Sequence, residues 1–264
     1  NKMRIQYASD LHLEFSDNHS YLKRNPLKSV GDILVLAGDI GYLNDSNYIK
    51  YPFWDWASDN YKQVIATIGN HELYQYYDLT NMPHGLVCSI RDNVKCYYNA
   101  IVRIENVDFI ISTLWAKIPL DEAYLTEYYV NDFHRILYNA EPLTWDKFNC
   151  EHDNCFRFIQ NEVANSTAEH IIVVTHHVPS FQLASPDFAG SKINGAFTVE
   201  LGEYIEGSPI EYWIYGHSHR NIDKFIGKTK CVSNQLGYVF HNEHLSFDPE
   251  KIIEIESTVK SITG

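Results

Sequence analysis

The stretch "VIATIGNHELY", residues 64–74, places an apolar run directly before glycine, asparagine, histidine and glutamate. Residues 64–68 are mostly β-branched and do not alternate with polar residues, which favours a strand buried on both faces. Gly69 and Asn70 are also common turn residues, so the polar residues have an ordinary interpretation as the end of that strand. Whether they do more than turn the chain depends on the residues that end the other apolar runs.

Similar apolar runs recur along the chain and predict further strands. They lie at residues 4–8, 33–37, 101–104, 109–112, 171–175, 212–215, 230–233 and 252–255. Apolar residues at three- and four-residue steps predict helices over residues 48–61 and 148–163. Strands interleaved with helices in this way indicate a layered α/β fold.

The length and composition agree with a single domain over residues 1–264. Of the 264 residues 45% are hydrophobic, which is enough for a sizeable core. The segment 115–142 is rich in aromatic and acidic residues and has no clear period. We expect this segment to be an insertion or lid over the edge of the sheet.

The sequence also argues against several classes of protein. No apolar stretch reaches the roughly 18 residues of a membrane span, and residues 1–10 lack the pattern of an export signal. The five cysteines are scattered without a CxxC pair, so we expect a reducing, cytoplasmic location and no disulfide framework. A net charge of -13 with scattered lysine and arginine argues against extended nucleic acid as a partner.

The residues directly after five of the apolar runs are of types that bind metal ions. In chain order they are Asp10 and His12, then Asp39, then Asn70 and His71, then His176 and His177, and finally His217 and His219. Each pair or single residue alone is typical of a turn or a helix cap. In α/β sheets, however, ligands bind at the carboxyl ends of strands, so residues distant in sequence meet in one crevice. Coincidence at five strand ends is a poor explanation, and we predict a metal site.

The residue types in this set indicate which ions it would bind. Carboxylate, amide and imidazole groups without thiolate suit Mn, Fe, Zn, Co or Ni better than Ca or Mg. Two aspartates, one asparagine and four imidazoles, seven ligands in all, are too many for one such ion, whereas two divalent or mixed-valence ions about 3.5 to 4 Å apart would use them all. Asp39 is the expected bridge. Glycines directly precede Asp39, Asn70 and His217, and we expect the backbone to turn sharply there.

The motifs "DLH", "GD", "GNHE", "TH" and "GHSH", in this order from residue 10 to residue 219, resemble those of the calcineurin-like metallophosphoesterases. The resemblance implies a four-layer αββα sandwich, in which two mixed sheets pack face to face and are flanked by helices. It implies that Asp39 bridges the two ions and that His71 approaches the substrate without binding metal. It also implies one ligand set per ion, namely Asp10, His12 and His219 for the first and Asn70, His176 and His217 for the second.

Some residues next to these motifs have more than one interpretation. In "THHVP" either histidine could bind the metal; we favour His176, because neighbouring side chains point to opposite sides, and keep His177 as a substrate contact. Arg220 would contact a substrate phosphate or form an ordinary salt bridge. Glu72 would orient His71 or a metal ligand, or be a solvated carboxylate or a charge at a helix start. The sequence "HNEH", residues 241–244, lacks a metal-binding spacing and is expected at the surface.

These expectations combine into a function. The chain would hydrolyse a small phosphomonoester or phosphodiester by attack of a metal-bound hydroxide. His71 would stabilise charge in the transition state or protonate the leaving oxygen. A nuclease of the same fold is one alternative, although it would need a basic groove. A non-catalytic metal-binding scaffold is another, although such a protein is expected to lose ligands or His71.

Overall fold

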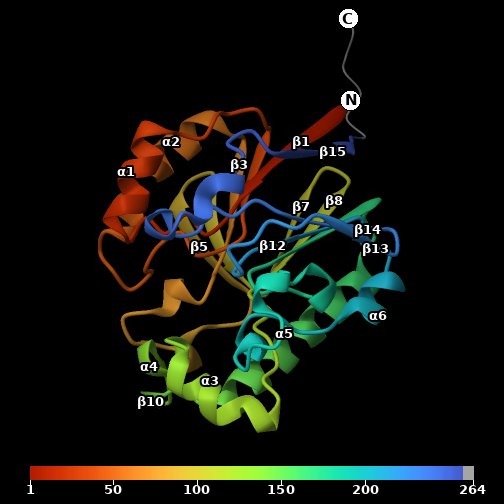
Figure 1. The fold of residues 1–264 in the computed structure, drawn as a ribbon. Helices are drawn as coiled ribbons and strands as arrows, with labels where there is room; N and C mark the ends of the chain where they lie inside the picture. Colours follow the sequence, from red (N-terminus) through yellow and green to blue (C-terminus); the bar gives the residue numbers. More distant parts are fainter. Residues whose placement is uncertain (258–264) are drawn as a thin grey trace, which may run out of the picture.

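Two mixed β-sheets form the centre of the computed structural model, which describes residues 1–257 (Figure 1). The first sheet contains, in spatial order, β15 (Ile252–Glu256), β1 (Lys2–Ala8), β2 (Ile33–Leu36), β3 (Gln63–Thr67), β6 (Val94–Tyr98) and β5 (Leu86–Arg91). The second contains β13 (Lys224–Ile226), β14 (Thr229–Ser233), β12 (Tyr212–Tyr215), β11 (His170–Thr175), β8 (Val107–Ser112) and β7 (Ala100–Ile104). In both sheets four parallel strands lie between two antiparallel edge strands.

The two sheets pack face to face, because alternate residues of their buried strands point to opposite sides. Ile33 and Val35 of β2 belong to the same apolar cluster as Ile172 and Val174 of β11, so this cluster lies between the sheets. Leu34, which points the other way, belongs to a second cluster that also contains residues of the helices. The core therefore has an inner layer between the sheets and outer layers beneath the helices.

Helices cover the outer face of each sheet (Figure 1). α1 (Ser16–Arg24) and α2 (Pro52–Asn60) lie beside the first sheet, and α2 contacts β3, β5 and β6. On the second sheet, α5 (Trp145–Asn165) contacts β8 and α6 (Gly202–Glu206) contacts β13. The predicted four-layer αββα sandwich of two mixed sheets is confirmed.

The segment 115–142 forms small elements of its own at one end of the molecule (Figure 1). They are α3 (Ala123–Tyr129), α4 (Asp132–Arg135), β9 (Ile136–Tyr138) and β10 (Glu141–Pro142). β9 pairs with β10 and with the short β4 (Tyr77–Asp78), which gives a third, three-stranded sheet. The assignment of this segment as an insertion into one domain stays a prediction.

The predicted strands all correspond to strands of the structure, and the helix predicted over residues 148–163 lies within α5. The helix expected over residues 48–61 is divided into a 3-10 turn, Tyr48–Lys50, and α2, because Pro52 fixes a helix start. β5 and β6 were not predicted, since charged residues such as Arg91 and Lys95 interrupt their apolar pattern. Within residues 1–257 no helix has the length and apolar character that a membrane crossing needs. None of the five cysteines forms a disulfide.

Candidate metal centre

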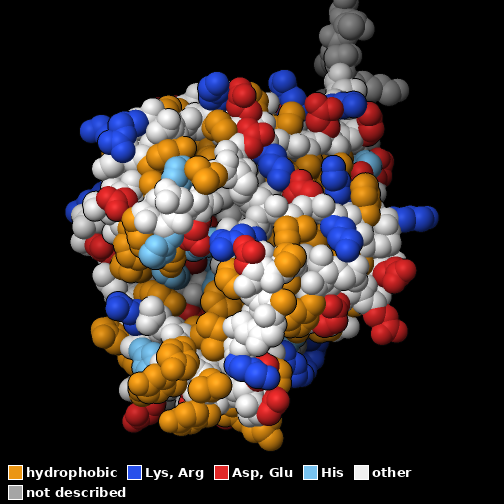
Figure 2. Space-filling model, in the orientation of Figure 1, with side chains coloured by type: hydrophobic (Ala, Val, Ile, Leu, Met, Phe, Trp, Pro, Cys, Tyr) orange, Lys and Arg blue, Asp and Glu red, His pale blue; other side chains and the backbone are white. Residues whose placement is uncertain are grey.

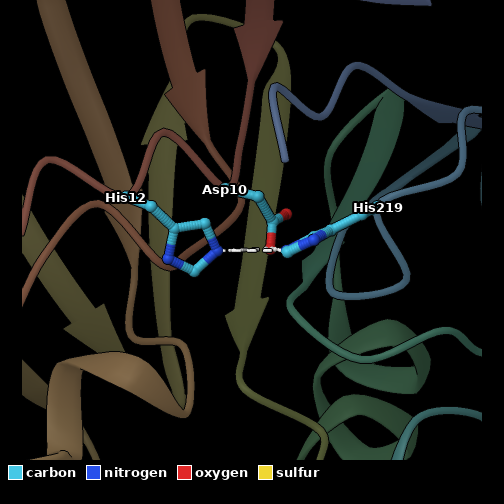
Figure 3. Close-up of side chains that lie close together, drawn as sticks. All are labelled: Asp10, His12 and His219. Carbon is cyan, nitrogen blue, oxygen red and sulfur yellow. Dashed lines mark hydrogen bonds and ion pairs between the residues drawn. The ribbon is translucent and has the colours of Figure 1, made fainter. Parts of the chain in front are cut away.

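Side chains from five strand ends converge at one edge of the two sheets. They come after β1 (Asp10 and His12), β2 (Asp39), β3 (Asn70), β11 (His176) and β12 (His217 and His219). All of them are buried or nearly so. Figure 3 shows Asp10, His12 and His219 pointing toward one another although His219 comes from the opposite sheet. The predicted convergence of distant residues is therefore present in the structure.

The first group consists of Asp10, His12 and His219. Asp10 Oδ1 lies 3.7 Å from Nε2 of His12 and 3.3 Å from Nε2 of His219. The two Nε2 atoms are 3.1 Å apart, while each Nδ1 lies 2.9 Å from a carboxylate, that of Glu14 or Glu243. With Nδ1 donating, both Nε2 atoms present lone pairs to each other, and Asp10 Oδ1 has no hydrogen-bond partner among the described residues. A cation between these three atoms would resolve both conflicts.

The second group adjoins the first and shares Asp39 with it. His176 Nε2 lies 3.0 Å from Asn70 Oδ1 and 3.2 Å from Asp39 Oδ2. His217 joins Asp39 and His176 in a group whose ligand atoms all lie within 4.8 Å of one another. Asp39 Oδ2 is also 3.7 Å from His12 Nε2, so this oxygen lies between the two groups. This is the position that a bridging ligand requires.

Backbone carbonyls fix the outward-facing nitrogens of the two histidines in the second group. His176 Nδ1 lies 2.7 Å from the carbonyl oxygen of Ala37, and His217 Nε2 lies 3.3 Å from that of Ala196. His176 would therefore bind through Nε2 and His217 through Nδ1. Such contacts set the tautomer and ring orientation of metal-binding histidines.

The histidines of the centre differ in their affinity for protons. Burial lowers their pKa values, but nearby carboxylates outweigh burial and raise the pKa of His12 and His219, and raise that of His176 to about 9. For His217 burial prevails and lowers the pKa to about 3. In the absence of cations, protons on His12, His176 and His219 would balance the negative charge of the buried carboxylates. Metal ions would take the place of those protons.

Several ligands lie on backbone that residues with a Cβ seldom adopt. The φ angles are 53° at Asp10, 47° at His12, 57° at Asp39, 73° at His217 and 55° at His219. Such conformations cost about 1–3 kcal/mol each and persist only where the surrounding structure enforces them. The backbone of these strand-end turns thus directs the side chains toward the candidate metal centre.

The glycines before the ligands act in two different ways. Gly38 has a φ of 94° and makes a sharp turn, as predicted. Gly69 and Gly216 have no positive φ; they are required by space. A Cβ on Gly69 would lie 2.3 Å from Asp39 Oδ1, and one on Gly216 would lie 2.6 Å from Asp10 Oδ2. At these two positions the close approach of a candidate ligand, and not a positive φ, excludes a side chain.

Glu72 agrees with its first interpretation, because it orients the candidate ligand Asp39, but it does so through backbone groups. Its carboxylate is fully buried and accepts four hydrogen bonds from backbone N–H groups. Those from Asp39 and Gly69 are 2.7 Å long, and those from Ile40 and Gly41 are 2.9 Å long. Burial raises the pKa of Glu72 to about 8, while these N–H groups favour its ionised form. Glu72 holds the turn that carries Asp39 in place.

His71 lies beside the centre with its two ring nitrogens in different environments. Its ring stacks on that of Tyr74 at 4.3 Å, and Nδ1 lies 2.9 Å from Glu14 Oε1. Nε2 lies 3.3 Å from the hydroxyl of Tyr238. His71 also donates its backbone N–H to Asp39 Oδ1 at 2.9 Å. The side chain is thus anchored on one side and presents Nε2 on the other.

The two predicted substrate contacts occupy other places. His177 is fully buried, packs on Trp115 and His217, and its Nδ1 lies 3.1 Å from the carbonyl oxygen of Thr113. It does not line the cavity next to the metal centre, so a direct substrate contact is not supported.

Arg220 forms salt bridges with two carboxylates, Asp187 and Glu243, each at 3.2 Å, as its alternative interpretation predicted. Its guanidinium lies over the ring of Phe188, 4.9 Å from the ring centre. The expected surface position of residues 241–244 is wrong for Glu243, which is half-buried against His219.

Three acidic residues that support the ligands were missed by the sequence analysis. Glu14 and Glu243 bind the outer nitrogens of His12 and His219, as described above. Asp132, in α4, accepts the side-chain amide of Asn70 at 2.8 Å. Only Glu14 had a local signal, because it comes two residues after His12 in "DLHLE".

A cavity of about 320 Å³ opens beside the centre. Figure 2 shows a hollow on this face of the molecule, with histidine side chains near it. Asp39, Asn70, His71, His217 and His219 form its polar floor. The walls come from the α3–α4 segment, from residues 184–198 and from Tyr238.

Comparison with known proteins agrees with this geometry. The family model described as calcineurin-like phosphoesterase matches residues 3–221. An uncharacterised protein of Acanthamoeba polyphaga mimivirus is 30% identical over 285 residues, which cover 96% of this chain and 98% of that protein.

Solved structures share the fold at low sequence identity. The phosphopantetheinyl hydrolase of Mycobacterium tuberculosis has a TM-score of 0.67 at 14% identity, with 95% of each chain covered. A protein of Thermus thermophilus has a TM-score of 0.51 at 10% identity, with 96% of this chain and 98% of that chain covered. The family model matches most of the chain, and the five motifs lie together at one site. The chain therefore belongs to the calcineurin-like phosphoesterase family.

Proposed function

We propose that this protein is a metal-dependent hydrolase that acts on a phosphoric monoester or diester of a small molecule. One observation carries the proposal: two groups of ligands meet at Asp39, and His71 lies beside them on the floor of the same cavity. Membership of the family supports a hydrolase. The unpartnered Asp10 Oδ1 and the facing lone pairs of His12 and His219 support a fit of these residues to cations.

The chain would hold two ions through the sets described above, with Asp39 shared between them. When bound, these ions would lower the pKa of a water molecule and offset the negative charge of the phosphoryl oxygens. The protein itself contributes orientation, because Glu14, Glu243 and two backbone carbonyls fix the rings of the histidines. It also excludes bulk water, since the ligands are almost completely buried.

His71 is the residue that we assign to the leaving group. Because Glu14 accepts at Nδ1, the ring keeps a proton there and directs Nε2 toward the cavity. As the imidazolium, with a second proton on Nε2, the ring would donate that proton to the leaving oxygen or stabilise the charge that develops on it. Stacking on Tyr74 holds the ring in this position.

Activity and metal content, measured on the same protein, test the proposal. Protein loaded with manganese should hydrolyse p-nitrophenyl phosphate or bis(p-nitrophenyl) phosphate. His71→Ala should keep two ions per chain and lose about 10²–10⁴-fold in kcat, whereas His134→Ala, at an exposed histidine of α4, should retain activity. Full activity of His71→Ala would reject the role of His71. Two bound ions without hydrolysis of either ester would favour a non-catalytic scaffold.

A nuclease remains the alternative enzyme, and the cavity argues against it. No lysine or arginine is among the residues from 1–257 that line the cavity. An extended nucleic acid would need such side chains along its backbone. A small-molecule ester does not.

A further inference from the structure

We infer that the cavity selects esters whose alcohol part is apolar and carries no second anionic group. This inference rests on the proposed hydrolase function and adds a substrate class to it. It comes from two properties of the lining, the apolar character of its walls and the sign of its charges.

The walls of the cavity are largely aromatic and aliphatic. Tyr129 and Val130 approach from the α3–α4 segment, and Phe188, Ile193 and Phe197 from the segment after β11. Phe197 stacks on the metal-site residue His217 with ring centres 4.6 Å apart. The alcohol part of an ester bound at the metal centre would therefore lie against these apolar walls. A planar or branched apolar group would fill the space between them.

The charged residues of the lining disfavour a second anion. The acidic residues of the lining are Asp39, Glu243 and Asp132, of which Asp132 is fully buried, and within the described part of the chain the lining contains no lysine or arginine. The nearest guanidinium, that of Arg220, is already paired with Asp187 and Glu243. The ions would neutralise the reacting phosphoryl group, but a carboxylate or second phosphate on the alcohol would find no lysine or arginine among the described lining residues to pair with.

The size of the cavity agrees with one small alcohol. At about 320 Å³ it lies at the lower end of the 300–1,000 Å³ that is typical of small-molecule sites. The floor holds the reacting phosphoryl group, so the remainder accommodates a group of about the size of a substituted aromatic ring.

A pair of esters that differ in one charge tests the inference. The ester with an uncharged para substituent is 4-carbamoylphenyl phosphate, and the ester with an anionic one is 4-carboxyphenyl phosphate, which has nearly the same shape. We name them the neutral and the anionic ester after this substituent. We expect kcat/KM to be at least about tenfold higher for the neutral ester, chiefly through KM, because a carboxylate in the cavity would lose its hydration beside Glu243 without a lysine or arginine to pair with.

A variant with an added cation makes the test specific to charge. Ser191 is half-buried and lines the cavity, so Ser191→Lys should reduce the preference for the neutral ester several-fold. Ser191→Gln, of similar length but uncharged, should leave the preference unchanged. Equal or better use of the anionic ester by the natural protein would overturn the inference and leave the hydrolase function standing. No turnover of either ester by metal-loaded protein would refute both.

A second inference rests on buried hydrogen bonds and is independent of the cavity. We propose that Asp132 is a positioning residue that fixes the amide of Asn70 so that its oxygen, and not its nitrogen, faces the second ion. Asp132 Oδ1 accepts from Asn70 Nδ2 at 2.8 Å and from the hydroxyl of Tyr74 at 2.7 Å. On the other side, Asn70 Oδ1 lies 3.0 Å from His176 Nε2. Asp132 is fully buried.

The chemistry of the amide explains why Asn70 needs this partner. The oxygen and nitrogen ends of an asparagine have almost the same shape, so the side chain can rotate by half a turn at little steric cost. A carboxylate can only accept hydrogen bonds, so it holds the NH₂ end and leaves the oxygen for the cation. An amide in the reversed orientation would direct a donor at the ion.

Exchange of the two side chains tests this role. Asp132→Asn should lower the affinity for the second manganese ion about 10–100-fold by titration calorimetry, since the new amide offers either end to Asn70. The double variant Asn70→Asp with Asp132→Asn should restore much of that affinity, because the carboxylate introduced at residue 70 would accept from the new amide and still offer an oxygen.

The exchange also separates positioning from general stability. Asp121→Asn, at an exposed carboxylate in the same segment, should bind both ions normally. Normal affinity of Asp132→Asn, or failure of the double variant to recover, would overturn the proposal, since a purely structural loss would not be reversed by the exchange.

Discussion

Among single residues, Glu14 connects a metal ligand with the proposed catalytic histidine. Its Oε1 lies 2.9 Å from Nδ1 of both His12 and His71. Its other oxygen, Oε2, has no hydrogen-bond partner among the described residues. One carboxylate oxygen therefore sets the orientation of both rings, and neither ring can rotate without affecting the other.

Replacement of Glu14 should show its effect on the leaving group. For Glu14→Gln we expect kcat to fall about 10–100-fold, because an amide oxygen holds the two rings less strongly. The loss should be larger for phenyl phosphate than for p-nitrophenyl phosphate, since the poorer leaving group depends more on His71. Steady-state kinetics with both esters measure this, with Asp17→Asn, at an exposed carboxylate, as the control. Equal losses for the two esters would contradict a role through His71.

The raised pKa of His176 predicts how metal binding depends on pH. Asp39 raises it to about 9 against burial, compared with about 6.5 for an ordinary histidine. In metal-free protein the bound proton therefore stabilises the fold fully below about pH 6.5, and this stabilisation is lost as the pH rises through about 9. Because a cation must displace that proton, manganese affinity should rise across this window in calorimetric titrations. An affinity that stays constant or falls would show that the proton is absent.

Among the strands and turns, the turn after β3 is limited by space. A Cβ at residue 69 would lie 2.3 Å from Asp39 Oδ1, so Gly69→Ala should displace Asp39 and reduce the metal content of the purified protein. Gly207→Ala is the matched control, because the nearest atom to its Cβ would be 3.7 Å away. Elemental analysis and circular dichroism would distinguish loss of metal from loss of fold. A Gly69→Ala protein with its full metal content would contradict the predicted clash.

The α3–α4 segment should affect the substrate more than the chemistry. Figure 2 shows hydrophobic side chains gathered at the end of the molecule where this segment lies, and Tyr124 and Tyr129 are among the exposed ones. Only Tyr129 lines the cavity. Tyr129→Ala should raise KM for aryl phosphates several-fold with little change in kcat or metal content, while Tyr124→Ala should change none of these. A fall in kcat without a change in KM would place Tyr129 in the chemistry instead.

The parts of the site that could be predicted are those that lie directly after strand ends. A buried strand and the ligand after it are neighbours in sequence, so the pattern of apolar runs located both. The supporting carboxylates are different, because Asp132 is 62 residues from Asn70 and Glu243 is 24 residues from His219. Glu72 was visible in the sequence, but its partners are backbone groups of a turn at residues 39–41, which no pattern of side chains reveals.

Across the molecule as a whole, the centre stands out for its buried carboxylates. Asp10 and Asp39 are fully buried there, and neighbouring histidines outweigh burial and keep the pKa values of both low. Buried carboxylates without cations are costly, so the bound ions should stabilise the fold as well as serve the reaction.

Removal of the ions should therefore lower the melting temperature. Each ion at 100 times its dissociation constant adds about 2.7 kcal/mol to the free energy of unfolding, and chelation removes that contribution. Differential scanning calorimetry with and without a chelator measures the shift. Asp39→Ala, which lacks the shared ligand, should respond much less. A melting temperature that is unchanged by chelation in the natural protein would mean that the centre is empty or contributes no stability.

The distance between the ligands along the chain bears on when the protein acquires its metals. His12 and His219 meet across 207 residues, from strands of opposite sheets. Neither ion has a complete set of ligands until the second sheet has formed against the first, which is a late event when contacts are so far apart in sequence. Ions at this centre would therefore bind after the fold has formed. Which of the ions that suit these ligands the protein carries would then depend on the metal supply that the folded protein encounters.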